Sequence, residues 1–352
     1  MNISMGKMVA VQTKQGKAFP VLTGLVIALI TSIIFSLAMG RYGIPLRDLF
    51  SLLLAKVFPF CSTDVDAVSS AVLFRVRMPR ILAATLVGAA LASSGASYQG
   101  IFKNPMVSPD LLGASAGASF GVALGIMLGF NVILIQFIAF GFGLLAVLTT
   151  CAVSARIGRN QDSILIMTLS GILVGSIFMS FVTLIKYVAD HYSKMPAITF
   201  WLMGSLSAVN VRDLWFMLVP MVLGLTPLLL LRWKLNVLAL GDEEAKALGV
   251  NTGRIRFVII ICATLMTAAA VSISGIIGWV GLVVPHLTRM LVGPNYRVLL
   301  PASALIGGAY LLLMDDLARL ACATELPLGV LTALIGAPFF IFLLMRTKKG
   351  WA

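Results

Sequence analysis

Long runs of residues without a formal charge constrain this chain more than any other feature of its sequence. A run of about 20 apolar residues is long enough to cross the hydrocarbon core of a bilayer as an α-helix. Hydrophobic residues make up 60% of the chain and charged residues 11%, whereas about a quarter of the residues in soluble domains are charged. We therefore predict an all-α polytopic membrane protein with about ten transmembrane helices. The runs cover residues 21–39, 81–102, 111–155 (two spans, divided at Gly129 and Asn131), 163–185, 214–231, 257–288 (two spans, divided near Ser274 and Gly275), 298–314 and 326–345.

An even number of spans places both ends of the chain on the same side of the membrane. Basic residues precede the first span and follow the last, namely Lys7, Lys14, Lys17, Arg346, Lys348 and Lys349. Because segments rich in Lys and Arg stay in the cytoplasm, we predict a cytoplasmic tail (1–20), one ten-span membrane domain (21–345) and a second cytoplasmic tail (346–352). Residues 195–211 are uncharged but short, and we expect an interfacial or partly re-entrant segment there.

The chain carries 26 Lys and Arg against 13 Asp and Glu, a formal net charge of +13. In a soluble protein such an excess would suggest binding to nucleic acid. Here most of it falls in loops that the ten-span topology places in the cytoplasm, so the orientation rule accounts for it. We therefore expect the chain to lie in the lipid bilayer and to have no nucleic-acid partner.

Several functions are excluded or disfavoured because their residue patterns are missing. The chain has no Walker A pattern, so it is not expected to bind ATP by that route. It has two His and no Cys pair at metal-ligand spacing, so we predict no metal site. The sequence also shows no Ser-His-acid set of the kind that an intramembrane enzyme would need. No acidic residue lies in the middle of a predicted span, which disfavours an ion-coupled carrier. A self-contained secondary transporter or channel is the alternative, since backbone carbonyls alone can bind sodium.

Two of the four cysteines, Cys61 and Cys322, fall in loops that we predict to be external. An external compartment permits a disulfide bond. The sequence does not show whether the two residues are close together, so their pairing stays open.

Arginines gather on the predicted external side, where the orientation rule does not expect cations. Arg75, Arg77 and Arg80 surround Pro79 just before the second span, and Arg319 precedes the last span on the same side. One interpretation is that these side chains reach lipid headgroups. The other is that they dock an acidic surface of an external partner, because the guanidinium group forms bidentate pairs with carboxylates.

The predicted cytoplasmic segment 240–256 contains a short helix. Asp242, Glu243 and Glu244 open it, where acidic residues suit the positive end of the helix dipole. Ala245, Ala247 and Leu248 continue it, and Gly249 is a typical C-terminal capping residue. This helix is either a solvated connector or a rigid projection that fits a cleft in a cytoplasmic motor.

Several motifs in a fixed order make the chain resemble a known family. They are Arg77-Met78-Pro79-Arg80, Gly88 and Gly95 in the second span, Asn104-Pro105, Leu111-Leu112-Gly113, Trp201-Leu202-Met203-Gly204, Ala247-Leu248-Gly249-Val250, Pro285-His286, Glu325-Leu326-Pro327 and Gly336-Ala337-Pro338. Each motif alone is weak. Together, in this order and from about Arg75 to Arg346, they resemble the FecCD-type permeases of ABC importers for iron chelates and cobalamin.

The resemblance implies a transmembrane permease subunit that moves a metal chelate into the cytoplasm. A ferric siderophore is the first candidate substrate, and haem or cobalamin is the next. It implies a second permease subunit, either identical or homologous, and two cytoplasmic ATPase subunits that use ATP and Mg. It also implies an extracytoplasmic binding protein, free or lipid-anchored, and location in the bacterial plasma (inner) membrane. The chain itself would bind no cofactor and would not be an enzyme. Spans 2–5 and 7–10 would form inverted repeats.

The resemblance also implies roles for individual residues. Arg77, Arg80 and Arg319 would dock the binding protein, and the segment from Asp242 to Gly249 would couple to the ATPase. The fifth and tenth spans would line the translocation pathway, with Ser170, Gly171, Ser176, Thr332 and Gly336 facing it. Asn160 and Gln161 would lie at the cytoplasmic gate.

Overall fold

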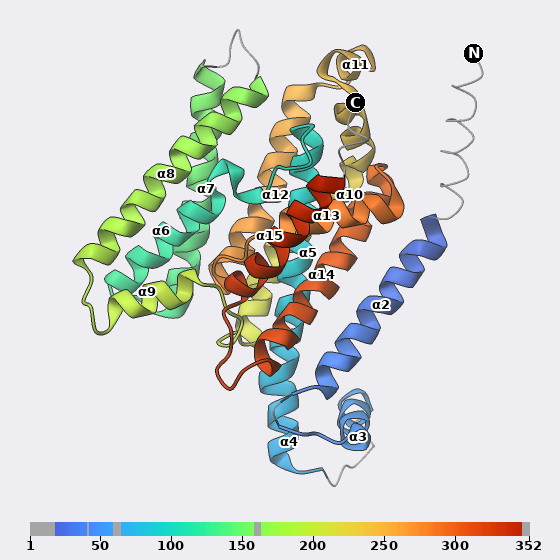
Figure 1. Cartoon of the computed structure of the whole chain (residues 1–352), viewed down its shortest axis with the longest axis vertical. Coiled ribbons are helices and arrows are strands. Elements are labelled where there is room, and N and C mark those ends of the chain that lie inside the picture. Colours follow the sequence, from blue (N-terminus) through green and yellow to red (C-terminus); the bar gives the residue numbers. More distant parts are fainter. Residues whose placement is uncertain (1–17, 41, 59–64, 158–162, 347–352) are drawn as a thin grey trace.

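The computed structural model describes residues 18–40, 42–58, 65–157 and 163–346, and all regular secondary structure in these ranges is helical (Figure 1). The helices are α2 (Ala18–Ala38), α3 (Leu46–Val57), α4 (Ala67–Ala71), the π-helical turn η1 (Val72–Arg77), α5 (Met78–Ile101), the 3₁₀ turn η2 (Pro109–Leu112), α6 (Ala114–Met127), α7 (Val132–Ile157), α8 (Ser163–Val188), α9 (Lys194–Leu202), α10 (Val211–Leu240), α11 (Asp242–Ala247), α12 (Thr252–Ser274), α13 (Val280–Val292), α14 (Tyr296–Leu320) and α15 (Leu328–Arg346).

Each of the ten predicted spans coincides with one helix, namely α2, α5, α6, α7, α8, α10, α12, α13, α14 and α15. Within the described ranges, seven helices are long and apolar enough to cross a membrane, and three further apolar helices are shorter. The shorter ones are α6, α13 and the stretch Leu328–Leu343 of α15. The prediction of an all-α polytopic membrane protein is therefore confirmed. The segment predicted to be interfacial contains α9, which has 9 residues and is too short to span.

The second predicted span, α5, is the centre of the bundle. It continues α4 and η1 as one helix from Ala67 to Ile101, and most of its residues are buried. Its most extensive contacts are with α14, α12, α10 and α13 (Figure 1). Small residues permit this, because a β-carbon on Gly95 would lie 1.9 Å from the carbonyl oxygen of Gly281 at the start of α13.

A second group of helices consists of α6, α7, α8 and α9 (Figure 1). Here too glycines allow close approach, since a β-carbon on Gly117 of α6 would lie 2.3 Å from the carbonyl oxygen of Phe142 in α7. The helix α12 joins the two groups, because it packs against α5 and α10 as well as against α6 and α7. On the other side of the bundle, α2 lies along α14 at the edge of the molecule (Figure 1).

The chain turns sharply at both predicted divisions. Gly129 (φ 73°) separates α6 from α7, and Gly275 (φ 70°) follows the end of α12, both in the left-handed region that glycine adopts readily. Trp279 is also left-handed (φ 70°) at the start of α13. The short helices α6 and α13 occupy corresponding positions in the two predicted repeats. The 3₁₀ turn η2 precedes α6, and residues 275–279, which have no regular secondary structure, precede α13.

Candidate docking, coupling and pathway sites

A cluster of arginines and carboxylates lies where the ends of α14 and η1 meet. Arg80, in the first turn of α5, donates from Nε and Nη2 to both carboxylate oxygens of Asp315 at 2.9–3.0 Å. Its Nη1 donates to Glu325 at 3.0 Å, in the loop between α14 and α15. Arg319 donates to Asp316, and to the hydroxyl oxygen of Ser36 on α2 at 3.1 Å. The cluster therefore ties α2, α5, α14 and the following loop together.

Arg77 has a different role, because it binds backbone carbonyls. Its Nη1 donates to the carbonyl oxygen of Leu37 at 2.7 Å, and its Nη2 donates to that of Tyr42. These carbonyls lie at and after the C-terminal end of α2, where helices leave acceptors unsatisfied. A β-carbon on Gly40 would lie 2.3 Å from Nη2 of Arg77, so the guanidinium group lies directly against this part of the chain.

The three arginines are thus less open than the sequence suggested. Arg77, Arg80 and Arg319 are only 4%, 8% and 8% exposed, and each has acceptors within the chain. Burying a guanidinium group is costly unless a carboxylate or carbonyl group compensates its charge, which explains why each of these arginines has such a partner. The spacing of the arginines in the sequence gave no sign of these partners. Their role in docking stays a prediction.

A pocket of about 190 Å³ nevertheless opens beside these arginines. Its lining includes Arg77, Arg80, Arg319, Tyr42 and Glu325. The Glu325 side chain is 35% exposed, whereas that of Asp315, the other partner of Arg80, is fully buried. A carboxylate from outside could therefore reach Arg80 most easily by replacing Glu325.

The helix α11 projects from the opposite end of the bundle (Figure 1). It ends in the capping arrangement predicted for Gly249, which has φ 75°. The amide of Gly249 donates to the carbonyl oxygen of Lys246 at 2.9 Å, and the amide of Val250 donates to that of Ala245, also at 2.9 Å. Ala245 and Val250 are buried against the bundle, so the helix is fixed by one apolar face.

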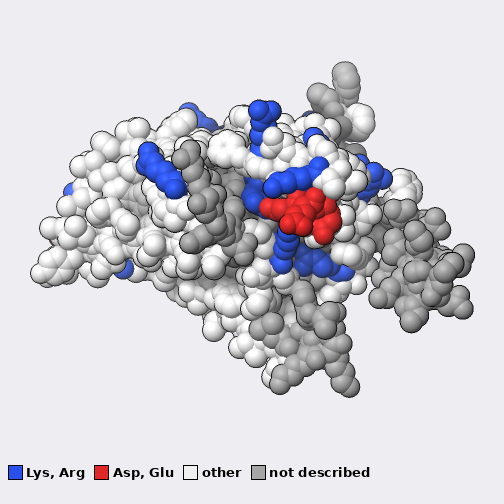
Figure 2. All heavy atoms as spheres, turned by 90° about the horizontal axis from the view of Figure 1, so that it is seen from above, with Lys and Arg blue, Asp and Glu red and all other residues white. Residues whose placement is uncertain are grey.

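An ion pair holds the start of α11. Asp242 accepts from Nη2 of Arg256 at 2.9 Å and lies 3.4 Å from Nζ of Lys103. Burial alone would raise the pKa of Asp242, but the charges of Arg256 and Lys103 outweigh it and hold this pKa below its usual value. Figure 2 shows the acidic residues as one red patch surrounded by basic side chains. The residues of α11 and its cap that stay open to a partner are Glu243, Glu244, Lys246, Ala247, Leu248 and Gly249.

The predicted pathway residues are mostly turned into the chain. Ser170, Gly171, Thr332 and Gly336 are buried, and only Ser176, on α8, is exposed. A β-carbon on Gly171 would lie 2.2 Å from the carbonyl oxygen of Leu111, and one on Gly336 would lie 2.7 Å from Cβ of Trp279. The glycines therefore serve the packing of α8 against η2 and of α15 against the start of α13. The predicted role of these five residues in the translocation pathway stays a prediction.

Two sets of predicted residues lie outside the part of the chain that the structure describes. Asn160 and Gln161, predicted at the cytoplasmic gate, belong to the segment between α7 and α8 that is not described. Cys61 is also outside, so the question of its pairing with Cys322 stays open.

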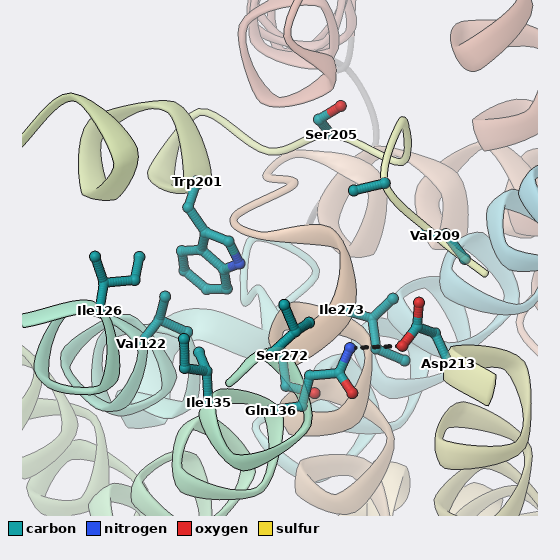
Figure 3. A pocket seen from close by; sticks show the side chains of 12 residues that line it. Val122, Ile126, Ile135, Gln136, Trp201, Ser205, Val209, Asp213, Ser272 and Ile273 are labelled. Carbon is teal, nitrogen blue, oxygen red and sulfur yellow. Dashed lines mark hydrogen bonds between the residues drawn. The ribbon is translucent and has the colours of Figure 1, made fainter. Parts of the chain in front are cut away.

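Sequence reasoning missed a pocket of about 250 Å³ between α6, α7, α9 and α12 (Figure 3). Gln136 donates to the carboxylate of Asp213 at 2.7 Å on one side of it, and Trp201 lies on another. Asp213 also forms a reciprocal cap with Asn210 at the start of α10. The Asn-x-x-Asp spacing before an apolar run is a signal that could have placed this carboxylate in a cap.

Comparisons with known proteins match this arrangement. The sequence pattern described as the FecCD transport family matches residues 28–346. The chain belongs to the FecCD transport family. The molybdate import system permease protein MolB of Haemophilus influenzae is 42% identical over 339 residues, which are 96% of this chain and 98% of that protein. The cobalamin import system permease protein BtuC of Halobacterium salinarum is 42% identical over 270 residues, 76% of this chain and 72% of that protein.

A solved structure gives the same result for the fold of this FecCD family member. It is described as an inward-facing conformation of a metal-chelate type ABC transporter, and it superposes with a TM-score of 0.83 at 39% identity, covering 93% of this chain and 99% of that one. This chain is thus an integral membrane protein and a permease of the ABC importer class.

Proposed function

We propose that this permease carries a metal-containing solute into a bacterial cytoplasm across the plasma (inner) membrane, with both termini on the cytoplasmic side. It would pair with a second permease subunit, identical or homologous. Two ATPase subunits that use ATP and Mg would supply the energy, and the chain itself would bind no cofactor. The observation that carries the proposal is the membership of the FecCD family over nearly the whole chain.

The position of α11 supports the proposed coupling. The open residues of α11 and its cap, among them Leu248, lie at one end of the bundle. Figure 2 shows an acidic patch with basic side chains around it at this end. That end would be cytoplasmic by the orientation rule. An exposed leucine on a helix fixed by Ala245 and Asp242 is suited to a pocket in an ATPase subunit, because apolar side chains at the centre of an interface contribute most of its binding energy.

The pocket beside Arg80, at the other end, supports docking of an external binding protein. A carboxylate of that protein would replace Glu325 as the partner of Arg80, while Asp315 keeps the buried side of the guanidinium group compensated. The exchange would cost little, because one partly exposed ion pair is replaced by another with the same guanidinium group. It would also release the loop that leads into α15.

For the substrate, a ferric siderophore and a molybdate-type oxyanion are the two classes to compare. Two relatives in Helicobacter pylori are described as probable iron chelatin permeases, at 38% identity and 79% of this chain. The molybdate permease matches a larger share of the chain at 42% identity. Molybdate is therefore a candidate substrate of equal rank with the siderophore. Haem and cobalamin follow, since permeases for these solutes are also among the relatives.

The test is uptake into proteoliposomes that hold this chain together with its cognate ATPase, with the binding protein added outside. Labelled ferric siderophore, molybdate, haem and cobalamin are compared, each with and without ATP. We expect uptake of one of them only when ATP, ATPase and binding protein are all present. Uptake by this chain alone would overturn the proposal and favour a secondary transporter or channel.

A further inference from the structure

A third pocket, of about 210 Å³, lies near the end of the bundle that carries α11. It is lined by Cys151 and Ser154 from the last turns of α7, Met167 from the second turn of α8, and Arg256, Phe257 and Ile260 from the first turns of α12. None of these residues belongs to the docking cluster or to the predicted pathway.

Arg256 lines this pocket and keeps one hydrogen-bond donor without a partner among the described residues. Its side chain is 9% exposed and its Nη2 donates to Asp242, but its buried Nε has no hydrogen-bond partner among the described residues. A buried N–H group without an acceptor costs free energy comparable to a lost hydrogen bond, and more when the group is charged. The Nε atom is closed to solvent in this structure, so an anionic oxygen in the pocket would satisfy it after the Arg256 side chain turns toward the pocket.

The start of α12 adds a second attraction for an anion. Gly253, in the first turn of this 23-residue helix, also lines the pocket. The side chain of the Asn251 cap accepts from the amide of Arg254, while the amides of Thr252 and Gly253 precede the first hydrogen bonds of the helix. The first amides of a helix lack acceptors inside the helix, and with the helix dipole they form a binding site for phosphate-like groups.

The remaining wall is apolar and partly open to the side. Met167 and Ile260 line it, and Phe257 is 50% exposed. A free inorganic oxyanion gains nothing from such a wall. A phospholipid does, because its phosphate can meet Arg256 while its glycerol and acyl carbons cover the apolar side chains. Basic pockets between transmembrane helices on the cytoplasmic side are typical binding sites for anionic headgroups.

We propose that this pocket binds the phosphate of an anionic phospholipid from the cytoplasmic leaflet, with Arg256 Nε and the first turn of α12 as donors. The proposal rests on the orientation given above. Because Arg256 also holds Asp242, the lipid would share a guanidinium group with the anchor of α11. It would thereby help to fix the helix proposed to contact the ATPase.

Native mass spectrometry of the detergent-purified transporter tests the proposal. Phosphatidylglycerol and phosphatidylcholine with identical acyl chains are titrated onto the wild type, Arg256→Gln, Ser154→Leu and Arg254→Gln. Ser154→Leu fills the pocket and leaves the charge, whereas Arg254 is an exposed arginine in the same turn and serves as the matched control. Sodium phosphate and sodium molybdate are added as competitors in separate titrations.

We expect phosphatidylglycerol to bind the wild type and Arg254→Gln equally. It should bind Arg256→Gln about tenfold more weakly, as for loss of a charge-assisted hydrogen bond. It should also bind Ser154→Leu more weakly, because the leucine side chain takes up space in the pocket. Equal weakening in Arg254→Gln, or no preference over phosphatidylcholine, would overturn the proposal. Displacement of the lipid by phosphate or molybdate at low millimolar concentration would instead assign the pocket to a free oxyanion. Because no transport is measured, failure here is distinct from failure of the proposed import.

Discussion

A β-carbon on Gly88 of α5 would lie 2.1 Å from the carbonyl oxygen of Gly307 in α14, and one on Gly307 would lie 2.4 Å from the carbonyl oxygen of Gly88. The two helices therefore cross with their backbones in contact. In a membrane, where the hydrophobic effect does not drive helices together, such close packing supplies much of the association energy. This crossing joins the central helix to the helix that carries Asp315.

The crossing predicts that Gly88→Ala destabilises the protein although alanine favours helices. The added methyl group must push α5 and α14 apart, and overpacking of this kind costs about 1–3 kcal/mol. The measurement is thermal unfolding of the purified protein in detergent. The matched control is Gly141→Ala in α7, where a β-carbon meets nothing within 4 Å. That variant should unfold at the same or a higher temperature, and equal losses in both variants would contradict the crossing.

The spans were predictable because each obeys a local rule. A run of about 20 uncharged residues defines a membrane helix without reference to its neighbours, and the divisions at Gly129 and Gly275 follow from the conformational freedom of glycine. The short helix that begins at Asp242 and its cap at Gly249 were predictable for the same reason, since their signals lie within a few neighbouring residues.

The partners of the arginines were not predictable, because they depend on which helices lie side by side. Arg80 and Asp315 are 235 positions apart, and only the crossing of α5 and α14 brings them together. For the same reason, small residues such as Gly171 and Gly336 could be placed on the right helices but not on a face. Their packing against η2 and Trp279 is tertiary information.

The pairing of Arg80 with Asp315 predicts that Arg80→Gln is strongly destabilising. It removes the bidentate partner of the fully buried Asp315, and Arg319, whose Nε lies 3.4 Å from the same carboxylate, makes up only part of the loss. Breaking a buried pair costs up to about 3–5 kcal/mol. The thermal unfolding temperature and the yield of folded protein should both fall. Arg75→Gln, which changes an exposed arginine five positions earlier, should leave both unchanged. The double variant Arg80→Met with Asp315→Leu should recover part of the loss, and no recovery would show that the pair is not the cause.

The exposure of Leu248 predicts that its replacement weakens binding of the ATPase subunit and leaves the stability of the permease unchanged. Leu248 is 58% exposed at the end of α11, so Leu248→Asp should leave the thermal unfolding temperature of the isolated permease unchanged. If the side chain enters the ATPase subunit, an aspartate there should weaken the complex at least about tenfold, because it would be desolvated without a partner. The readouts are ATPase binding to the immobilised permease and ATP-driven uptake. Unchanged binding would place the contact elsewhere.

The exposure of Glu325 predicts that removing its charge strengthens docking. In the proposed exchange Glu325 competes with the binding protein for Arg80, so Glu325→Gln should tighten binding of that protein. The gain should be no more than about fivefold, since a partly exposed ion pair contributes roughly 0–1 kcal/mol. Affinity is measured by surface plasmon resonance with the permease in nanodiscs.

Asp66→Asn removes another exposed acid before α4 that does not line the pocket, and it controls for the general change in surface charge. An equal gain in both variants would attribute the effect to long-range charge, and weaker binding of Glu325→Gln would mean that Glu325 supports docking and does not compete with it.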